Sequence, residues 1–183
     1  GANRLASNSL MECLVFARQL ASIELSHSLV QKVNIQDSIA IPCSLQLETM
    51  ESADALIDAI QDLRELCWRE AGVARSIGGM KDALSSIRKD YQDIRKEPLL
   101  QLVDNQTWDA YHCFEDNSRR TVNLLLDLSH RHLTSALLME ACLFRGESRG
   151  GHFRKDVPLS LPYWECHSRQ KMGTSLSTRP VNT

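Results

Sequence analysis

The chain has 183 residues, with 21 Lys and Arg against 23 Asp and Glu, and a formal net charge of −2. Apolar residues make up 43% of it and charged residues 24%, which is typical of a globular protein and excludes general disorder. The near-neutral charge gives no support for binding nucleic acid or an anionic membrane, and no apolar run approaches the roughly 20 residues that span a bilayer.

The start of the chain predicts a helix that belongs to a separate domain. Between Asn8 and about Ile23, apolar side chains recur about every three to four residues, as on one face of a helix. Residues 25–50 lose this period and include Ser, Asn, Asp and Pro. A linker of that length is unusual inside one compact domain. We therefore expect residues 1–24 to belong to one domain and residues 25–50 to be a linker. Because the chain begins at Gly1 without an initiator Met, we also expect it to be part of a longer protein.

Three further helices are predicted: one over about residues 51–75, one that follows Gly78-Gly79 and runs to about residue 96, and one over about residues 118–144. A break is expected at Gly78-Gly79, and Pro98 is expected to stop the middle helix. Residues 97–117 are interpreted as a polar connection. The middle helix has an apolar seam made of Ile77, Met80, Leu84, Ile87, Tyr91 and Ile94. The expected buried side of the last helix comprises Val122, Leu125, Leu126, Leu133, Leu137 and Phe144.

These patterns predict an all-α fold. Each of the three later helices has one apolar stripe, and packing the stripes together gives a three-helix bundle over residues 51–145. One extra N-terminal helix and the linker precede this bundle. Residues 146–183 are expected to form an irregular C-terminal segment, with a frayed end after Gln170.

The sequence does not support a metal site or nucleophilic catalysis. The six cysteines include no CxxC pair, so we expect no zinc site and no disulfide scaffold, and we interpret the cysteines as reduced. His130 and His132 lie on different faces of a helix and make a poor metal pair. Ser148 has no GxSxG context.

Residues 1–10, GANRLASNSL, are the most informative segment of the chain. They place small and polar residues directly before a helix, where unpaired N–H groups can hold an electron-rich ligand edge. Arg4 can form a bidentate pair with a carboxylate. The alternative is an ordinary Asn or Ser helix cap beside a surface arginine.

Residues 1–10, followed by Glu12-Cys13-Leu14-Val15-Phe16, resemble the last flavin-contacting segment of the L-aspartate oxidase family. That family belongs with the succinate dehydrogenase and fumarate reductase flavoproteins. Residues 147–156, ESRGGHFRKD, followed by Trp164 and His167, are similar to the segment after the helical domain in the same superfamily.

The resemblance implies that Ser9 and Leu10 contact FAD and that Arg4 binds a carboxylate of L-aspartate. The family reaction oxidises L-aspartate to iminoaspartate in NAD (quinolinate) biosynthesis, with oxygen or fumarate as the electron acceptor. The implied partners are the enzyme's own N-terminal FAD domain and, as a further candidate, quinolinate synthase. Bacterial members are cytoplasmic, and plant members lie in the plastid stroma.

The same resemblance implies that the catalytic residues lie upstream of this chain. The proton-transfer arginine of the family has no counterpart here, and no GxGxxG motif follows a strand. We therefore expect the isolated chain to be inactive and not to retain FAD, with no catalytic residue of its own.

Two alternatives to an L-aspartate oxidase fragment stay open at this point. One is the C-terminal part of a fumarate reductase or succinate dehydrogenase flavoprotein, and the other is a non-catalytic helical interaction module. The block at 147–156 also has two interpretations. It is either a charged cluster that faces a flavin domain or substrate entrance, or a Gly-hinged loop that pins the chain end, with Arg149 and Glu147 in ion pairs.

Overall fold

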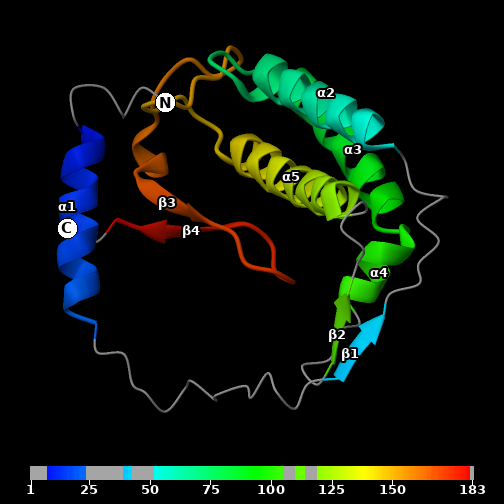
Figure 1. Cartoon of the computed structure of the whole chain (residues 1–183). Coiled ribbons are helices and arrows are strands. Elements are labelled where there is room, and N and C mark those ends of the chain that lie inside the picture. The colour runs from blue at the N-terminus through cyan, green and yellow to red at the C-terminus, as the bar shows by residue number, and fades with distance from the viewer. Residues whose placement is uncertain (1–7, 24–38, 43–51, 105–109, 114–118, 182–183) are drawn as a thin grey trace. The chain divides into compact units, whose positions relative to one another are not determined.

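The computed structural model describes residues 8–23, 39–42, 52–104, 110–113 and 119–181 (Figure 1). Helices make up most of the described chain, and the predicted all-α class is confirmed. The chain divides into two compact units, residues 1–38 and residues 39–183, and each is treated by itself below.

The first unit contains one described helix, α1 (Asn8–Ala21). Arg18 lies in its last turn, where a cation complements the negative end of the helix dipole. Five apolar side chains in the C-terminal half of α1 and directly after it are exposed, namely Leu14, Val15, Phe16, Leu20 and Ile23. Within its own unit, α1 therefore has an apolar surface that the described residues leave uncovered.

Helix α2 (Ala53–Ala71) opens the bundle, and Ser52 caps its N-terminus. The Ser52 hydroxyl accepts a hydrogen bond from the Ala55 N–H at 3.2 Å and satisfies a donor that the helix itself leaves unpaired. Leu56, Leu63 and Ala71 are its buried residues. The helix ends at Gly72, where a Cβ atom would collide with the carbonyl oxygen of Trp68.

Helix α3 (Ile77–Ile94) follows after a short turn. The expected break at Gly78-Gly79 is wrong, because both glycines lie in its first turn and the Ser76 hydroxyl accepts a hydrogen bond from the Gly79 N–H at 3.3 Å. The apolar seam is buried at its centre and more open at both ends. Met80, Ala83, Leu84 and Ile87 are buried.

The interpretation of residues 97–117 as a polar connection missed a helix. Pro98 begins α4 (Pro98–Asp104), a position that suits proline because the first helical N–H has no intrahelical partner. Leu99 and Leu100 of this short helix are almost fully buried. Further along, β2 (Ala110–Cys113) pairs in parallel with β1 (Ile39–Pro42), and Ile39 lies opposite Ala110.

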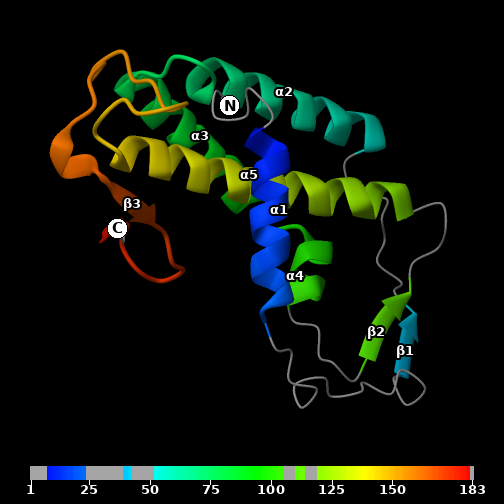
Figure 2. The ribbon, with the colours of Figure 1, turned by 90° about the vertical axis from the view of Figure 1, so that its left-hand side faces the viewer.

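Helix α5 (Arg119–Phe144) is the longest element and contacts both α2 and α3 (Figure 2). Its expected buried side is right for Val122 and Leu125 but wrong further on, where Leu133 and Leu137 are 41% and 42% exposed. His132 is buried in their place because its Nδ1 donates a hydrogen bond to the carbonyl oxygen of Leu128 at 2.9 Å. Ala136, Met139 and Cys142 complete the buried side.

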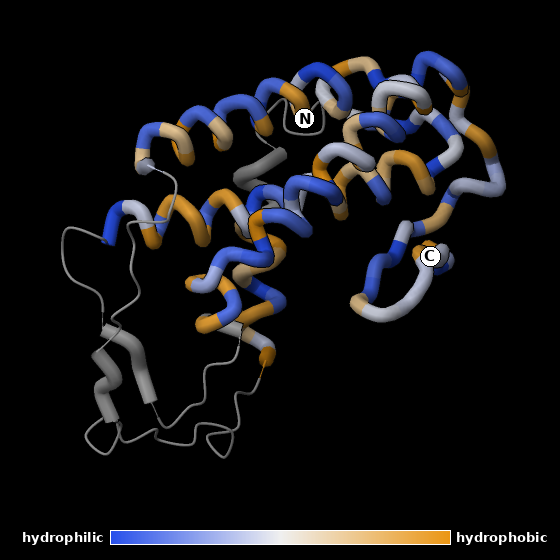
Figure 3. Tube along the Cα trace, turned by 90° about the vertical axis from the view of Figure 1, so that its right-hand side faces the viewer, coloured by the Kyte–Doolittle hydropathy of each residue, from blue (hydrophilic) through white to orange (hydrophobic). Residues whose placement is uncertain are grey.

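The bundle has two adjoining apolar clusters. One joins α2, α3 and the second half of α5, and its most buried members are Met80, Ile87 and Met139. The other joins Leu56 of α2 and two leucines of α4 to the first half of α5. Figure 3 shows apolar and polar positions alternating along these helices, the pattern of elements that bury one side.

The segment after α5 has more structure than the sequence indicated. A single 3-10 turn, η5 (Pro162–Trp164), leads into β3 (Cys166–Arg169), which pairs antiparallel with β4 (Ser177–Pro180). Gly173 lies between the strands with φ at 74°, a conformation that favours glycine. Among the described residues, no helix is long and apolar enough to cross a membrane.

Candidate functional site

Two of the three residues proposed for ligand binding lie in the first turn of α1. Ser9 and Leu10 follow its first residue, Asn8, and the structure describes their helical backbone but not their side chains. The first N–H groups of a helix have no partner within it. Arg4 lies outside the described residues.

The most organised polar cluster in the described chain lies directly after α5. We call it the tail clasp, and it consists of Arg75, Arg145, Glu147, Ser148, Arg149, His152, Arg154 and Asp156. At its centre Glu147 is fully buried. Its carboxylate accepts hydrogen bonds from Arg145 Nη2 at 2.6 Å and from Arg149 Nε at 2.8 Å. The backbone N–H of Leu161 donates to it at 2.8 Å.

These donors explain how a carboxylate can be buried here. Chiefly the hydrogen bond from Arg149, and then those from Leu161 and Arg145, lower the pKa of Glu147 from 4.5 to about 2, although burial acts in the opposite direction. The ion pair between Glu147 and Arg149 predicted by one interpretation of this block is confirmed.

Arg145 connects the end of α5 to the C-terminal hairpin. Its Nη2 donates to the carbonyl oxygen of Trp164 at 2.8 Å, and its Nη1 donates to that of Cys166 at 3.1 Å. Its guanidinium also lies 5.6 Å from the centre of the Trp164 ring, within cation–π range. Phe144 meets the same ring edge-to-face at 5.4 Å. One side chain thus fixes the path of the tail through η5 and into β3.

A second buried arginine fixes the loop inside the clasp. Arg154 is 4% exposed, pairs with the carboxylate of Asp156, and donates through Nη1 to the carbonyl oxygen of Arg145 at 3.0 Å. The hydrogen bond from Arg154 lowers the pKa of Asp156. Ser148 Oγ accepts a hydrogen bond from the Arg154 N–H at 2.8 Å and donates to the carbonyl oxygen of Val157 at 2.6 Å. The Ser148 hydroxyl therefore has a structural role, since it is hydrogen-bonded both as a donor and as an acceptor.

His152 and Arg75 join the clasp to the turn between α2 and α3. Arg75 Nη1 donates to His152 Nδ1 at 3.2 Å, and His152 Nε2 donates to the carbonyl oxygen of Arg145 at 3.3 Å. The backbones of the two segments are also hydrogen-bonded. The Arg75 N–H donates to the carbonyl oxygen of Phe153 at 3.0 Å, and the Lys155 N–H donates to the carbonyl oxygen of Arg75 at 2.8 Å.

The geometry of the clasp is that of a structural tether rather than a reaction centre. Each charged group named above has a partner inside the clasp. This arrangement supports the interpretation of residues 147–156 as a loop that pins the chain end. No sequence pattern predicts the role of Arg75, which lies more than 70 residues before the groups that it contacts.

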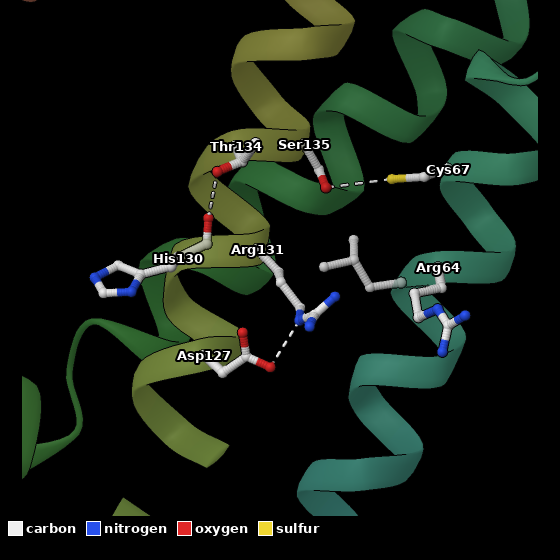
Figure 4. Close-up of a pocket in the computed structure, with 8 residues that line it drawn as sticks. Arg64, Cys67, Asp127, His130, Arg131, Thr134 and Ser135 are labelled. Carbon is white, nitrogen blue, oxygen red and sulfur yellow. Dashed lines mark hydrogen bonds and ion pairs between the residues drawn. The ribbon is translucent and has the colours of Figure 1, made fainter. Parts of the chain in front are cut away.

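A groove of about 360 Å³ lies between α2 and α5 (Figure 4). Its polar contacts join its own lining residues: Cys67 Sγ donates to Ser135 Oγ at 3.3 Å, and Arg131 pairs with Asp127 at 2.7 Å. No histidine or carboxylate within hydrogen-bond distance of Cys67 is seen among the described residues, so the groove has no activated nucleophile. No sequence motif marks these residues.

Metal binding and thiol reactivity depend on how the possible ligands and the thiols of the described residues are grouped and buried. The described residues contain no group of three or more His, Cys, Asp or Glu side chains that could hold a metal ion. Cys142 is buried, and burial raises the pKa of its thiol, which disfavours the reactive thiolate.

A helical bundle with a clasped C-terminal tail thus defines the class of this chain. The family model for the fumarate reductase flavoprotein C-terminal domain matches residues 60–183. The chain therefore belongs to this family of flavoprotein C-terminal domains, and the family resemblance seen in the sequence is confirmed.

Several relatives are L-aspartate oxidases. The chain is 33% identical over 173 residues to the L-aspartate oxidase of Nostoc sp., with 92% of this chain and 29% of the relative covered. It is 34% identical over 176 residues to that of Synechocystis sp., with 92% and 30% covered. The chloroplastic L-aspartate oxidase of Oryza sativa subsp. japonica is 28% identical over 168 residues, with 86% and 23% covered.

The chain spans less than a third of the length of these curated relatives. No solved structure matches it.

Proposed function

We propose that this chain is the C-terminal part of an FAD-dependent L-aspartate oxidase, which oxidises L-aspartate to iminoaspartate in NAD (quinolinate) biosynthesis. The observation that carries the proposal is the match of 92% of the chain, at 33% and 34% identity, to two relatives of that name. Since the chain corresponds to less than a third of each, the reaction belongs to the longer protein.

The proposed division of labour leaves the chemistry upstream. FAD, when bound, supplies the redox chemistry, and this chain contributes one edge of its site through Ser9 and Leu10. The start of α1 fits this role, because its unpaired N–H groups suit an electron-rich ligand edge. Arg4, just ahead of that turn, is proposed to pair with a carboxylate of L-aspartate. No catalytic residue is proposed within the chain.

The partner proposed for α1 is the protein's own FAD domain. Phe16 and Leu20, four residues apart on α1, lie on the same side of the helix and give an exposed apolar surface that a neighbouring domain would bury. In this proposal residues 1–24 belong to the FAD domain, residues 25–50 link it to the bundle at 51–145, and residues 146–183 form the tail.

The other proposed partners and the compartment follow from the same assignment. Oxygen or fumarate accepts the electrons, and quinolinate synthase is a candidate to receive the unstable product. For a plant source we propose the plastid stroma, as the name of the rice relative indicates for that enzyme, and for a bacterial source the cytoplasm.

The second candidate is a fumarate reductase or succinate dehydrogenase flavoprotein, which the description of the matching family favours. Substrate oxidation by a longer, flavin-loaded protein that contains this chain separates the two. We expect reduction of the flavin by L-aspartate and little reduction by succinate. Fast reduction by succinate with none by L-aspartate would select the second candidate.

The role of Arg4 is tested in that longer protein, with the flavin content measured for each variant. A guanidinium paired with a substrate carboxylate contributes roughly 2–5 kcal/mol when its loss leaves the partner unpaired. Arg4→Leu should therefore lower kcat/KM for L-aspartate about 30-fold or more, with normal flavin content. Arg4→Lys should recover little of it, because an ammonium lacks the planar fork. Unchanged kcat/KM in both variants would remove Arg4 from the site.

A further inference from the structure

The imidazole of His152 is the point where three separate segments of the chain meet. Arg75 comes from the turn between α2 and α3, Arg145 from the end of α5, and His152 from the loop of the tail clasp. Because an arginine side chain can only donate, the 3.2 Å contact from Arg75 Nη1 requires an unprotonated Nδ1 on His152. The proton of the neutral ring is then on Nε2, where it is donated to the Arg145 carbonyl oxygen at 3.3 Å.

The charges that act on this ring are all positive. Arg75 faces it from the α2–α3 turn, Arg145 from the end of α5, and Arg154 from its own loop. The two nearby carboxylates are engaged elsewhere, Glu147 with Arg145 and Arg149, and Asp156 with Arg154. The site therefore favours the neutral ring.

We propose that His152 is an acid-sensitive latch, whose protonation releases the loop at residues 149–155 from the turn between α2 and α3. A proton from water binds the Nδ1 lone pair, so that Arg75 Nη1 loses this acceptor, keeps only the carbonyl oxygen of Gly151 at 3.1 Å, and faces a second cation. The backbone hydrogen bonds beside it, from Arg75 to Phe153 and from Lys155 to Arg75, lose the support of this contact. The bundle core is separate from this contact and stays closed.

The direction of the pH effect follows from the environment of the ring. Burial first, and then the neighbouring arginines, lower the pKa of His152 below its ordinary value of 6.5. The open loop, with a more ordinary pKa, binds the proton more tightly than the latched loop does. The latch is thus fully stable above the pKa of the open form, and its stability falls as the pH drops toward the lower pKa of the latched form.

The test uses the 183-residue chain and measures amide hydrogen exchange residue by residue between pH 7.5 and pH 5. After correction for the intrinsic exchange rate, the Arg75 and Lys155 amides should lose up to about tenfold of their protection per pH unit within the titration window. The Met80 amide at the core should keep its protection. Equal behaviour of all three amides, or protection of the first two that is independent of pH, would overturn the latch.

Matched variants separate the latch from general acid effects. His152→Gln carries no titrating ring, and it should abolish the pH dependence at Arg75 and Lys155. His130→Gln, which removes an exposed histidine of α5, should leave that dependence intact. An NMR titration of the wild-type ring keeps the proposal testable if His152→Gln fails to fold. A His152 pKa at or above the ordinary value of 6.5 would contradict the latch.

Discussion

Glu147 shows how much of the tail depends on one buried side chain. Its carboxylate joins Arg145, Arg149 and the backbone of Leu161, and it lies at the point where α5 gives way to the tail. A buried charge is tolerated only when such donors replace water. The removal of this carboxylate therefore deprives two guanidinium groups of the anionic acceptor that they share.

Glu147→Gln should lower the free energy of unfolding by about 2–4 kcal/mol, since it breaks a buried pair from one side. Glu140→Gln is the matched control, because Glu140 pairs with the exposed side chain of Arg88 at 2.6 Å, and pairs of that kind contribute only about 0–1 kcal/mol. Urea unfolding at pH 7 measures both. Equal losses in the two variants would argue against the central role of Glu147.

The depressed pKa of Glu147 also predicts a pH dependence. The folded state holds the carboxylate ionised down to a pKa of about 2, whereas the unfolded chain takes up the proton near 4.5. The stability from this group is thus fully present above pH 4.5 and is lost as the pH falls toward 2. Urea unfolding at pH 5.5 and pH 3.5 should show a smaller loss of stability in Glu147→Gln than in wild type. An equal or larger loss in the variant would contradict the assignment.

At the scale of elements, apolar spacing predicted the long helices but not which leucines they bury. The bounds of α2, α3 and α5 fall within a few residues of the expected ranges, since each has a long periodic stripe. In α5, leucines occur on several sides, and spacing alone favoured Leu133 and Leu137 over His132. A hydrogen bond from the His132 side chain to the carbonyl oxygen of Leu128 allows the histidine to be buried. The spacing of apolar residues does not reveal such a hydrogen bond.

The short elements could not be predicted for a different reason. Helix α4 has 7 residues, too few to show a period, and its two buried leucines depend on partners in α2 and α5. In the tail clasp the ion pair of Glu147 was predictable from close spacing. The contribution of Arg75 was not, because the fold alone brings it to His152.

The orientation of α5 is tested by two substitutions on that helix. Met139 is fully buried against α3, so Met139→Ala should destabilise the bundle by about 2–5 kcal/mol through lost contacts and a cavity. Leu137 is 42% exposed, and Leu137→Ala should cost less than about 1 kcal/mol. Thermal or urea unfolding compares them. A larger loss of stability in Leu137→Ala than in Met139→Ala would mean that α5 buries the side that the sequence spacing indicated.

Helix α4 can be tested in the same way. Leu100 is 2% exposed within the cluster that joins α2 and α5. Leu100→Ala should therefore cost about 2–5 kcal/mol, whereas a polar connection would tolerate the change at well under about 1 kcal/mol. A loss of stability well under about 1 kcal/mol in Leu100→Ala would mean that α4 is not part of the folded core.

At the scale of the whole molecule, the chain consists of a bundle with its own core and a helix whose apolar side chains are exposed within its unit. Folding of the bundle requires only the burial of its own stripes. We therefore expect residues 51–145 to fold without the first 50. Hydrogen exchange on the 183-residue chain should find the amides of residues 9–21 much less protected than those of residues 122–140. Equal protection would contradict the assignment of α1 to another domain.

We propose that this chain is the C-terminal part of an L-aspartate oxidase and that the catalytic residues lie upstream of it. The most direct test of this proposal is a side-by-side assay of peroxide release from L-aspartate, with added FAD, by the 183-residue chain and by a longer protein that contains it. We expect a yellow, active longer protein and a colourless, inactive chain. Peroxide release by the chain alone, or a flavin-loaded longer protein that does not oxidise L-aspartate, would contradict it.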